Sequence, residues 1–194
     1  MDTQQKLEEL FQMIRMGHVQ GPLDPHNGLR GLYDMIQHRF KDGVVMAEIG
    51  SFQGASTMLF SMFAEKVYSI DCYDYPVPPT GRIPSHDQLF VDAERIFLER
   101  TSNIPNIIKI KKTSVEASRD FEDASLDLVY IDAEHDYNSV NTDVSLWKHK
   151  VKNGGILSGH DWTLPHIFTI LSEQNLLNDL EVYSDSSWSV IIER

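Results

Sequence analysis

The sequence has little cysteine and no long apolar run, and each shortage excludes a class of protein. A single cysteine, Cys72, excludes an intramolecular disulfide and a zinc site built on cysteines, and it fits a reducing compartment. No apolar run approaches the ~18 residues that a membrane span needs. The polar, acidic start does not have the pattern of a secretory signal. We therefore expect a cytoplasmic protein.

Basic residues are also scarce relative to acidic ones. The 17 Lys and Arg residues face 29 Asp and Glu residues, which gives a formal net charge of −12. Nucleic acid and anionic membranes are both held by clustered Lys and Arg. The charge balance therefore argues against both as partners.

The rest of the composition is that of an ordinary globular chain. Hydrophobic residues make up 41% of the 194 residues and aromatic residues 10%, which excludes wholesale disorder. The length suits one structural unit. Because the residue pattern changes after Gly43, we expect an N-terminal helical cap over residues 1–43 and the main domain over residues 44–194. Apolar side chains on the first helix would suit a homodimer.

Hydrophobic periodicity predicts alternating strands and helices. The expected strands cover residues 44–49, 66–70, 107–110, 126–131, 155–157, 180–183 and 189–192. The expected helices cover about residues 1–17, 29–41, 55–64, 87–100, 139–150 and 167–174. The Pro-rich segment 73–85 is expected to be a loop. This alternation predicts a doubly wound, Rossmann-like α/β fold: a seven-stranded, mostly parallel sheet with helices on both faces and an N-terminal helical cap.

Ligands of such a sheet bind beyond the carboxyl ends of its strands, so the residues after each strand are the first candidates for a site. The first strand runs into the loop Glu48-Ile49-Gly50-Ser51-Phe52-Gln53-Gly54. Gly50 permits a tight turn, and Gly54 permits close approach of a ligand to the backbone. The loop lacks the third glycine of the dinucleotide fingerprint and the Gly-Lys-Ser/Thr of the Walker motif, which favours a ligand without phosphate. Asp71 follows the second strand at close to the ~20-residue spacing expected for a carboxylate that binds ribose hydroxyls.

Two further strands deliver acids and histidines. The fourth expected strand leads into Asp132 and His135, and the fifth leads into His160 and Asp161. Carboxylates at adjacent strand ends can bind a hard divalent cation. An imidazole titrates near neutral pH and can accept a proton.

These motifs resemble those of class I S-adenosylmethionine-dependent methyltransferases. The motifs are Glu48-Ile49-Gly50-x-x-x-Gly54, Asp71, Ile131-Asp132-Ala133-Glu134-His135-Asp136-Tyr137, Asp143, Trp147, Lys152, Gly154-Gly155-Ile156 and Gly159-His160-Asp161. The second half of the pattern is similar to that of a small-molecule O-methyltransferase group. That group includes macrolide-sugar methyltransferases, and a related branch is described as cephalosporin hydroxylase-like.

The resemblance implies a methyl-donor site and a chemical site. The residues that would surround S-adenosylmethionine are Glu48, Gly50, Ser51, Gly54, Asp71, Ser114 and Asp132. Asp71 would hold the ribose hydroxyls, the segment 113–115 would border the adenine, and Asp132 would lie below the sulfonium. Asp132 and Asp161 would bind Mg²⁺, which orients the acceptor hydroxyl and lowers its pKa. His135 or His160 would be the base, and the acceptor would be a small hydroxyl-bearing molecule such as a sugar or a phenol.

Two other functions are compatible with the same residues. A nicotinamide-dependent oxidoreductase could use the same Asp71 for its ribose. A non-catalytic module could retain the S-adenosylmethionine pocket without turnover. The acids near His135 and His160 favour catalysis, because binding alone does not require them.

Overall fold

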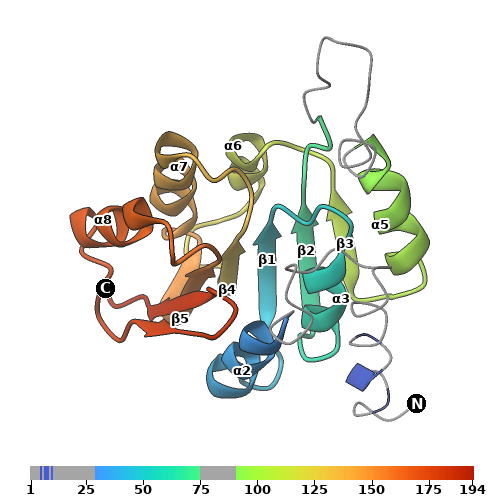
Figure 1. Cartoon of the computed structure of the whole chain (residues 1–194), viewed down its shortest axis with the longest axis horizontal. Helices are drawn as coiled ribbons and strands as arrows, with labels where there is room; N and C mark the ends of the chain where they lie inside the picture. The colour runs from blue at the N-terminus through green and yellow to red at the C-terminus, as the bar shows by residue number, and fades with distance from the viewer. Residues whose placement is uncertain (1–4, 6, 9, 11–28, 75–90) are drawn as a thin grey trace.

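The computed structural model describes residues 5, 7, 8, 10, 29–74 and 91–194, and its centre is a seven-stranded sheet (Figure 1). The strands lie side by side in the order β3-β2-β1-β4-β5-β7-β6. Their bounds are β1 Val45–Ile49, β2 Lys66–Ile70, β3 Ile107–Ile110, β4 Leu126–Ile131, β5 Val151–Gly159, β6 Glu181–Val182 and β7 Trp188–Ile191. The strands from β3 to β5 pair in parallel, whereas β7 runs antiparallel to β5 and β6. The predicted doubly wound sheet is therefore confirmed, and its strand order reverses between β1 and β4.

The register of the parallel strands brings their carboxyl ends to one edge of the sheet. Ile49 of β1 pairs with Ile70 of β2 on one side and with Ile131 of β4 on the other. Ile131 in turn pairs with Gly159 of β5. The residues that follow these four positions are consequently neighbours, as the parallel fold predicts.

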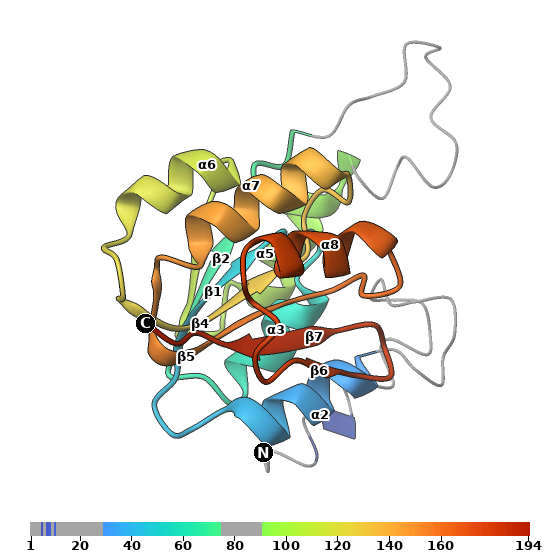
Figure 2. The same cartoon turned by 90° about the vertical axis from the view of Figure 1, so that its left-hand side faces the viewer.

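Helices cover both faces of the sheet (Figure 2). Their bounds are α2 Arg30–Arg39, α3 Ala55–Ser61, α5 Ala93–Thr101, α6 Ser114–Ala117, α7 Tyr137–Trp147 and α8 Pro165–Glu173, with a 3-10 turn η1 at Ser118–Asp120. On one face, Val144 and Trp147 of α7 and Ile170 of α8 pack in a core cluster with Val129 of β4. On the opposite face, α2 and α3 pack on β1 and β4 in a second core cluster. Burial on both faces explains why the central strands are almost continuously apolar.

The N-terminal part contributes to the second core cluster. The described residues 5, 7, 8 and 10 are helical, and Leu7 and Leu10 are buried in the same cluster as Leu32 and Met35 of α2. The other positions of the helix expected over residues 1–17 lie outside the described residues. The boundary between cap and main domain at residue 43 stays a prediction.

Several elements differ from their predicted bounds for local reasons. α7 begins at Tyr137 rather than at 139, because the carboxylate of Asp136 caps it and accepts hydrogen bonds from two backbone amides, at 3.0 and 3.2 Å. α8 begins at Pro165, whose ring suits the first turn of a helix. β5 extends over nine residues instead of the three predicted around residue 156. The short helix α6 was not predicted, although Thr113 and Glu116 form the capping box that marks its start.

The remaining differences concern segments at the periphery or outside the described residues. Most of the expected loop 73–85 and the first residues of the helix expected at 87–100 lie outside the described residues, and α5 begins at Ala93. Among the described residues, no helix has the length and apolar character of a membrane span.

Candidate functional site

The glycine loop after β1 is in direct contact with the end of β4. Gly50 has a φ of +89°, and a Cβ atom there would lie 2.1 Å from the carbonyl oxygen of Asp132. Gly54 has a φ of +83° and precedes the first residue of α3. A side chain at Gly50 would therefore be strained by its backbone and blocked by its neighbour. The tight turn expected at Gly50 is therefore present, and it lies close to the backbone of Asp132. The approach of a ligand to Gly54 stays a prediction.

Asp71 joins two backbone segments. Its Oδ2 accepts a hydrogen bond of 2.8 Å from the amide of Phe52 in the glycine loop, and its Oδ1 accepts one of 2.8 Å from the amide of Tyr73. The carboxylate is buried. Sequence reasoning predicted a contact to ribose for Asp71 but did not predict this clamp. Binding of ribose by Asp71 stays a prediction.

Tyr73 lies over the glycine loop and was missed in this role. Its hydroxyl is 3.3 Å from Oγ of Ser51, and the ammonium of Lys109 stands 4.9 Å from the centre of its ring. Burial raises the pKa of the Tyr73 phenol. Ser51 is itself buried, so its hydroxyl is directed at Tyr73 within the protein. The cation close to an aromatic ring was not visible in the sequence, because Lys109 is far from Tyr73 along the chain.

Glu48 is completely buried at the end of β1. Its carboxylate accepts hydrogen bonds from the hydroxyls of Ser56 and Thr57 in the first turn of α3. Burial raises the pKa of Glu48 to about 7, although the two hydroxyls act in the opposite direction. Glu48 thus connects β1 to α3 beneath the glycine loop. Its predicted part in donor binding is not tested by these contacts.

Ser114 faces α7. Its hydroxyl donates to Asp143 and accepts a hydrogen bond of 2.8 Å from the indole Nε1 of Trp147. Burial raises the pKa of Asp143 to about 6. Asp143 and Trp147 of the sequence motif therefore form a polar link between α7 and α6.

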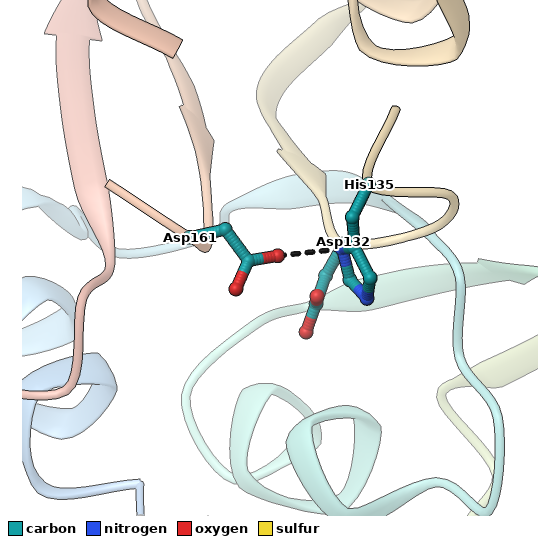
Figure 3. A group of neighbouring side chains, drawn as sticks. All are labelled: Asp132, His135 and Asp161. Carbon is teal, nitrogen blue, oxygen red and sulfur yellow. Dashed lines mark ion pairs between the residues drawn. The ribbon is translucent and has the colours of Figure 1, made fainter. Parts of the chain in front are cut away.

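The fold brings together the two acids and two histidines that were predicted to share a site. Figure 3 shows Asp132 and His135 at the end of β4, with Asp161 beside them after β5. Nδ1 of His135 lies 2.6 Å from Oδ2 of Asp161, and Nδ1 of His160 lies 3.1 Å from Oδ1 of the same residue. One carboxylate therefore contacts both imidazoles. Asp161 adopts this position with a φ of +63°, a conformation that non-glycine residues rarely use.

Proximity and burial shift the protonation of the cluster. For Asp161, the hydrogen bonds and charges of the two histidines outweigh burial and hold its pKa well below the usual range. For His160, burial alone would lower the pKa, but Asp161 and Asp132 outweigh it and raise the pKa to about 9. The hydrogen bond to Asp161 likewise raises the pKa of His135. Burial raises the pKa of Asp132 to about 6. Such opposed shifts within a few ångströms are typical of functional sites.

The cluster also has the composition of a metal site. One ligand atom each from Asp132, His135 and Asp161 lies within 4.8 Å of the others. Two carboxylates and an imidazole suit a divalent cation. His135 was predicted as a base and not as a ligand, so the geometry adds a third donor to the two predicted acids.

Comparison with known proteins decides what kind of fold carries this site. Residues 47–162 match the model of a family described as a methyltransferase domain. The chain belongs to this methyltransferase family. The matched region contains the glycine loop, Asp71 and all four members of the acid and histidine cluster.

One curated relative aligns with most of the sequence. The methyltransferase is 30% identical over 154 residues to y4gI, an uncharacterized protein of Sinorhizobium fredii. The match covers 71% of this chain but 15% of y4gI, so the chain spans only a small part of that relative.

Solved structures agree on the fold. The O-methyltransferase NovP superposes with a TM-score of 0.71 over 100% of both chains at 11% identity. Fibrillarin of Aeropyrum pernix, which contains natively bound S-adenosyl-L-methionine, superposes with a TM-score of 0.52 at 13% identity, over 77% of this chain and 66% of that one. At these identities the likeness concerns the fold. The predicted resemblance to class I S-adenosylmethionine-dependent methyltransferases is confirmed.

Proposed function

We propose that this methyltransferase transfers a methyl group from S-adenosylmethionine to a hydroxyl oxygen of a small acceptor held at the ends of β4 and β5. The observation that carries the proposal is the cluster in which Asp161 contacts both His135 and His160. A hydroxyl must lose its proton as its oxygen attacks, and an imidazole oriented by a carboxylate accepts that proton when the imidazole itself is neutral. Because the pKa of His160 is about 9, we expect turnover to rise as the pH approaches that value. The name of NovP, an O-methyltransferase with the same fold over its whole length, agrees with this reaction.

The reaction balances with the residues present. The bond between the methyl carbon and sulfur breaks, and a bond forms between that carbon and the acceptor oxygen. The hydroxyl proton passes to an imidazole, which leaves S-adenosylhomocysteine and a methyl ether. Because Asp161 contacts Nδ1 of both rings, Nε2 is the nitrogen that each ring offers to the acceptor. Most of the rate enhancement would come from alignment of the oxygen with the methyl group.

We assign the methyl donor to the glycine loop. Gly50 contacts the backbone of Asp132, which places the loop next to the cluster. Asp71 holds the loop through the amide of Phe52 and is the residue we expect to face the ribose. The side chain of Ser114 is engaged with α7, so we expect this segment to border the adenine through its backbone.

A divalent cation fits the cluster as a helper of the same reaction. Asp132, His135 and Asp161 would hold it, since their ligand atoms already lie within 4.8 Å of one another. When bound, Mg²⁺ or a similar ion lowers the pKa of a coordinated hydroxyl. His160 would then be the imidazole left to accept the proton.

Methyl transfer from labelled S-adenosylmethionine to a panel of hydroxyl compounds tests the proposal. We expect Asp161→Asn to lower kcat by roughly 10²- to 10⁴-fold, the usual contribution of general acid–base catalysis. Glu122→Gln, which removes an exposed carboxylate elsewhere, is the control and should keep the wild-type rate. Full turnover in Asp161→Asn would show that the cluster takes no part in the reaction. Full activity in EDTA would show that the reaction needs no cation and that the histidines act without one.

A further inference from the structure

Asp161 reaches both histidines of the cluster from a backbone conformation that residues other than glycine rarely adopt. Its φ of +63° lies in the left-handed region, which is unfavourable for a residue that carries a Cβ. Such a conformation persists only where the surrounding structure determines it. The contacts of the backbone on either side of Asp161 therefore decide where its carboxylate points.

The segment before Asp161 is held by Trp188, the first residue of β7. The indole Nε1 of Trp188 donates a 2.9 Å hydrogen bond to the carbonyl of His160. A Cβ on Gly159 would lie 2.7 Å from Cζ2 of that indole, so the indole lies this close to β5 only because Gly159 has no side chain. The amide of His160 donates a 3.0 Å hydrogen bond to the carbonyl of Ile131 in β4. Both polar backbone groups of His160 are thus engaged.

The segment after Asp161 is held by residues 183–187, the turn between β6 and β7. The amide of Trp162 donates a 3.0 Å hydrogen bond to the carbonyl of Ser186. Ser186 has a φ of +73°, and its amide donates a 3.1 Å hydrogen bond across the turn to the carbonyl of Tyr183. Loss of the positive φ at Ser186 would therefore direct its carbonyl away from Trp162.

The β6–β7 turn is itself fixed to α2 and to β4. Oδ1 of Asp185 accepts a 2.9 Å hydrogen bond from the amide of Ser187, and Oδ2 accepts one of 2.6 Å from the amide of Leu32 in α2 (Figure 2). The hydroxyls of Ser187 and Tyr130 lie 3.1 Å apart, and both residues are buried. Because the turn is fixed in this way, the hydrogen bonds that it makes to the end of β5 can hold that backbone in place.

We propose that Trp188 is a positioning residue, which together with the carbonyl of Ser186 holds Asp161 against the two histidines of the cluster. This inference rests on the proposed O-methylation, in which that carboxylate orients the imidazole that accepts the proton. Trp188 is only 1% exposed, so it acts through the backbone of residue 160 and not by contact with the acceptor. Misplacement of a catalytic group by about 1 Å can lower a rate by about 10²-fold, so loss of one anchor should lower kcat.

Trp188→Phe tests the anchor, because phenylalanine keeps an aromatic ring but has no N–H to donate. The assay uses the hydroxyl compound of the panel that the wild type methylates fastest. We expect kcat to fall roughly tenfold or more, with little change in KM or in the Kd of S-adenosylmethionine. In Asp161→Asn, where the carboxylate is already gone, the added Trp188→Phe should change kcat by less than about twofold. A tryptophan that acted independently of Asp161 would lower kcat by the same factor in both backgrounds.

The ring signals of the two cluster histidines give a second measurement, by NMR, that needs no acceptor. In protein with isotope-labelled histidine, Asp161→Asn defines where these signals lie without the carboxylate. At the same pH, Trp188→Phe should move both signals from their wild-type positions toward those of Asp161→Asn. Trp147→Phe is the matched control and should leave both signals in place. Trp147 is also a fully buried tryptophan, but its indole donates to the hydroxyl of Ser114 in α6.

A pair of proline substitutions tests the other anchor without a change in the core. Ser186→Pro replaces a φ of +73° by the value of about −65° that the proline ring imposes, which directs the carbonyl away from Trp162. It should move the histidine signals in the same direction as Trp188→Phe, and it supplies the test if Trp188→Phe does not fold. Ser184→Pro is the control and should leave the signals in place, because proline is favoured at the second position of a turn that starts at residue 183.

The outcomes separate this inference from the proposed function. Wild-type histidine signals in Trp188→Phe and in Ser186→Pro would overturn the inference. An equal fall in kcat with and without Asp161→Asn would overturn it too, and a low kcat in Asp161→Asn alone would then leave the proposed O-methylation intact. Full turnover in Asp161→Asn, or methylation of no compound in the panel, would count against the proposed function itself and would refute the inference as well.

Discussion

Replacement of Glu48 by glutamine should change how the stability of the protein depends on pH. Glu48 is completely buried, and its pKa is raised from 4.5 to about 7, mainly by burial. Between these two values the folded protein keeps a proton on Glu48, whereas the unfolded chain has lost it. The free energy of unfolding therefore falls as the pH rises through this window. Glutamine has no proton to lose and removes this contribution.

The size of the effect follows from the shift. Each pKa unit corresponds to 1.36 kcal/mol, so a shift of about 2.5 units corresponds to about 3 kcal/mol. At pH 4.5 and below, the wild type carries its full stabilising proton. By pH 8 that contribution is lost, and Glu48→Gln should have gained about 3 kcal/mol relative to the wild type. A constant offset is also expected, because the amide cannot accept from both Ser56 and Thr57, but it does not vary with pH.

Urea unfolding at pH values between 4.5 and 8 measures the effect. Glu122→Gln, at an exposed position, corrects for the general loss of one carboxylate. Other buried acids titrate in both proteins and cancel in the difference. If the difference in unfolding free energy between wild type and Glu48→Gln stays constant within ~0.5 kcal/mol, the burial argument for Glu48 is wrong.

Two further changes test the geometry of the site. Gly50→Ala should destabilise the fold by at least about 2 kcal/mol more than Gly154→Ala in the same urea assay, because both residues have positive φ but only Gly50 has a neighbour in the way of a Cβ. Equal losses would contradict the proposed contact with Asp132. Asp161→Asn should lower the pKa of His160 from about 9 toward or below its ordinary 6.5, because burial remains and the main opposing partner is gone. NMR titration of the imidazole measures this, and an unshifted His160 would show that Asp161 does not control it.

The fold was largely predictable because its central strands are buried on both faces. The bounds of β2, β3 and β4 match their predictions, since each is a short apolar run with a clear end. The rule that ligands lie at the carboxyl ends of parallel strands then directed attention to the residues that follow β4 and β5. It correctly placed Asp132, His135, His160 and Asp161 together, although they come from two strands.

The hydrogen bonds inside the site could not be predicted in the same way. Asp71 clamps the amide of Phe52, which is 19 residues away along the chain, and Ser114 bonds to Asp143 across 29 residues. Such contacts depend on how the helices pack on the sheet, and the hydrophobic periodicity of the sequence does not predict them. The type of residue at a strand end was visible from the sequence, but its partner was not. Which residues contact the donor remains a prediction for these positions.

The contact of Gly50 with the backbone of Asp132 has a consequence for how the protein can diversify. The loop assigned to the methyl donor and the strand end that carries the chemical cluster share one backbone contact, and the amide of Asp132 also donates a 2.8 Å hydrogen bond to the carbonyl of Ile49. Neither side can shift alone. New acceptor specificities should therefore arise by exchange of exposed side chains near the site, with the backbone of Gly50 and Asp132 left as it is.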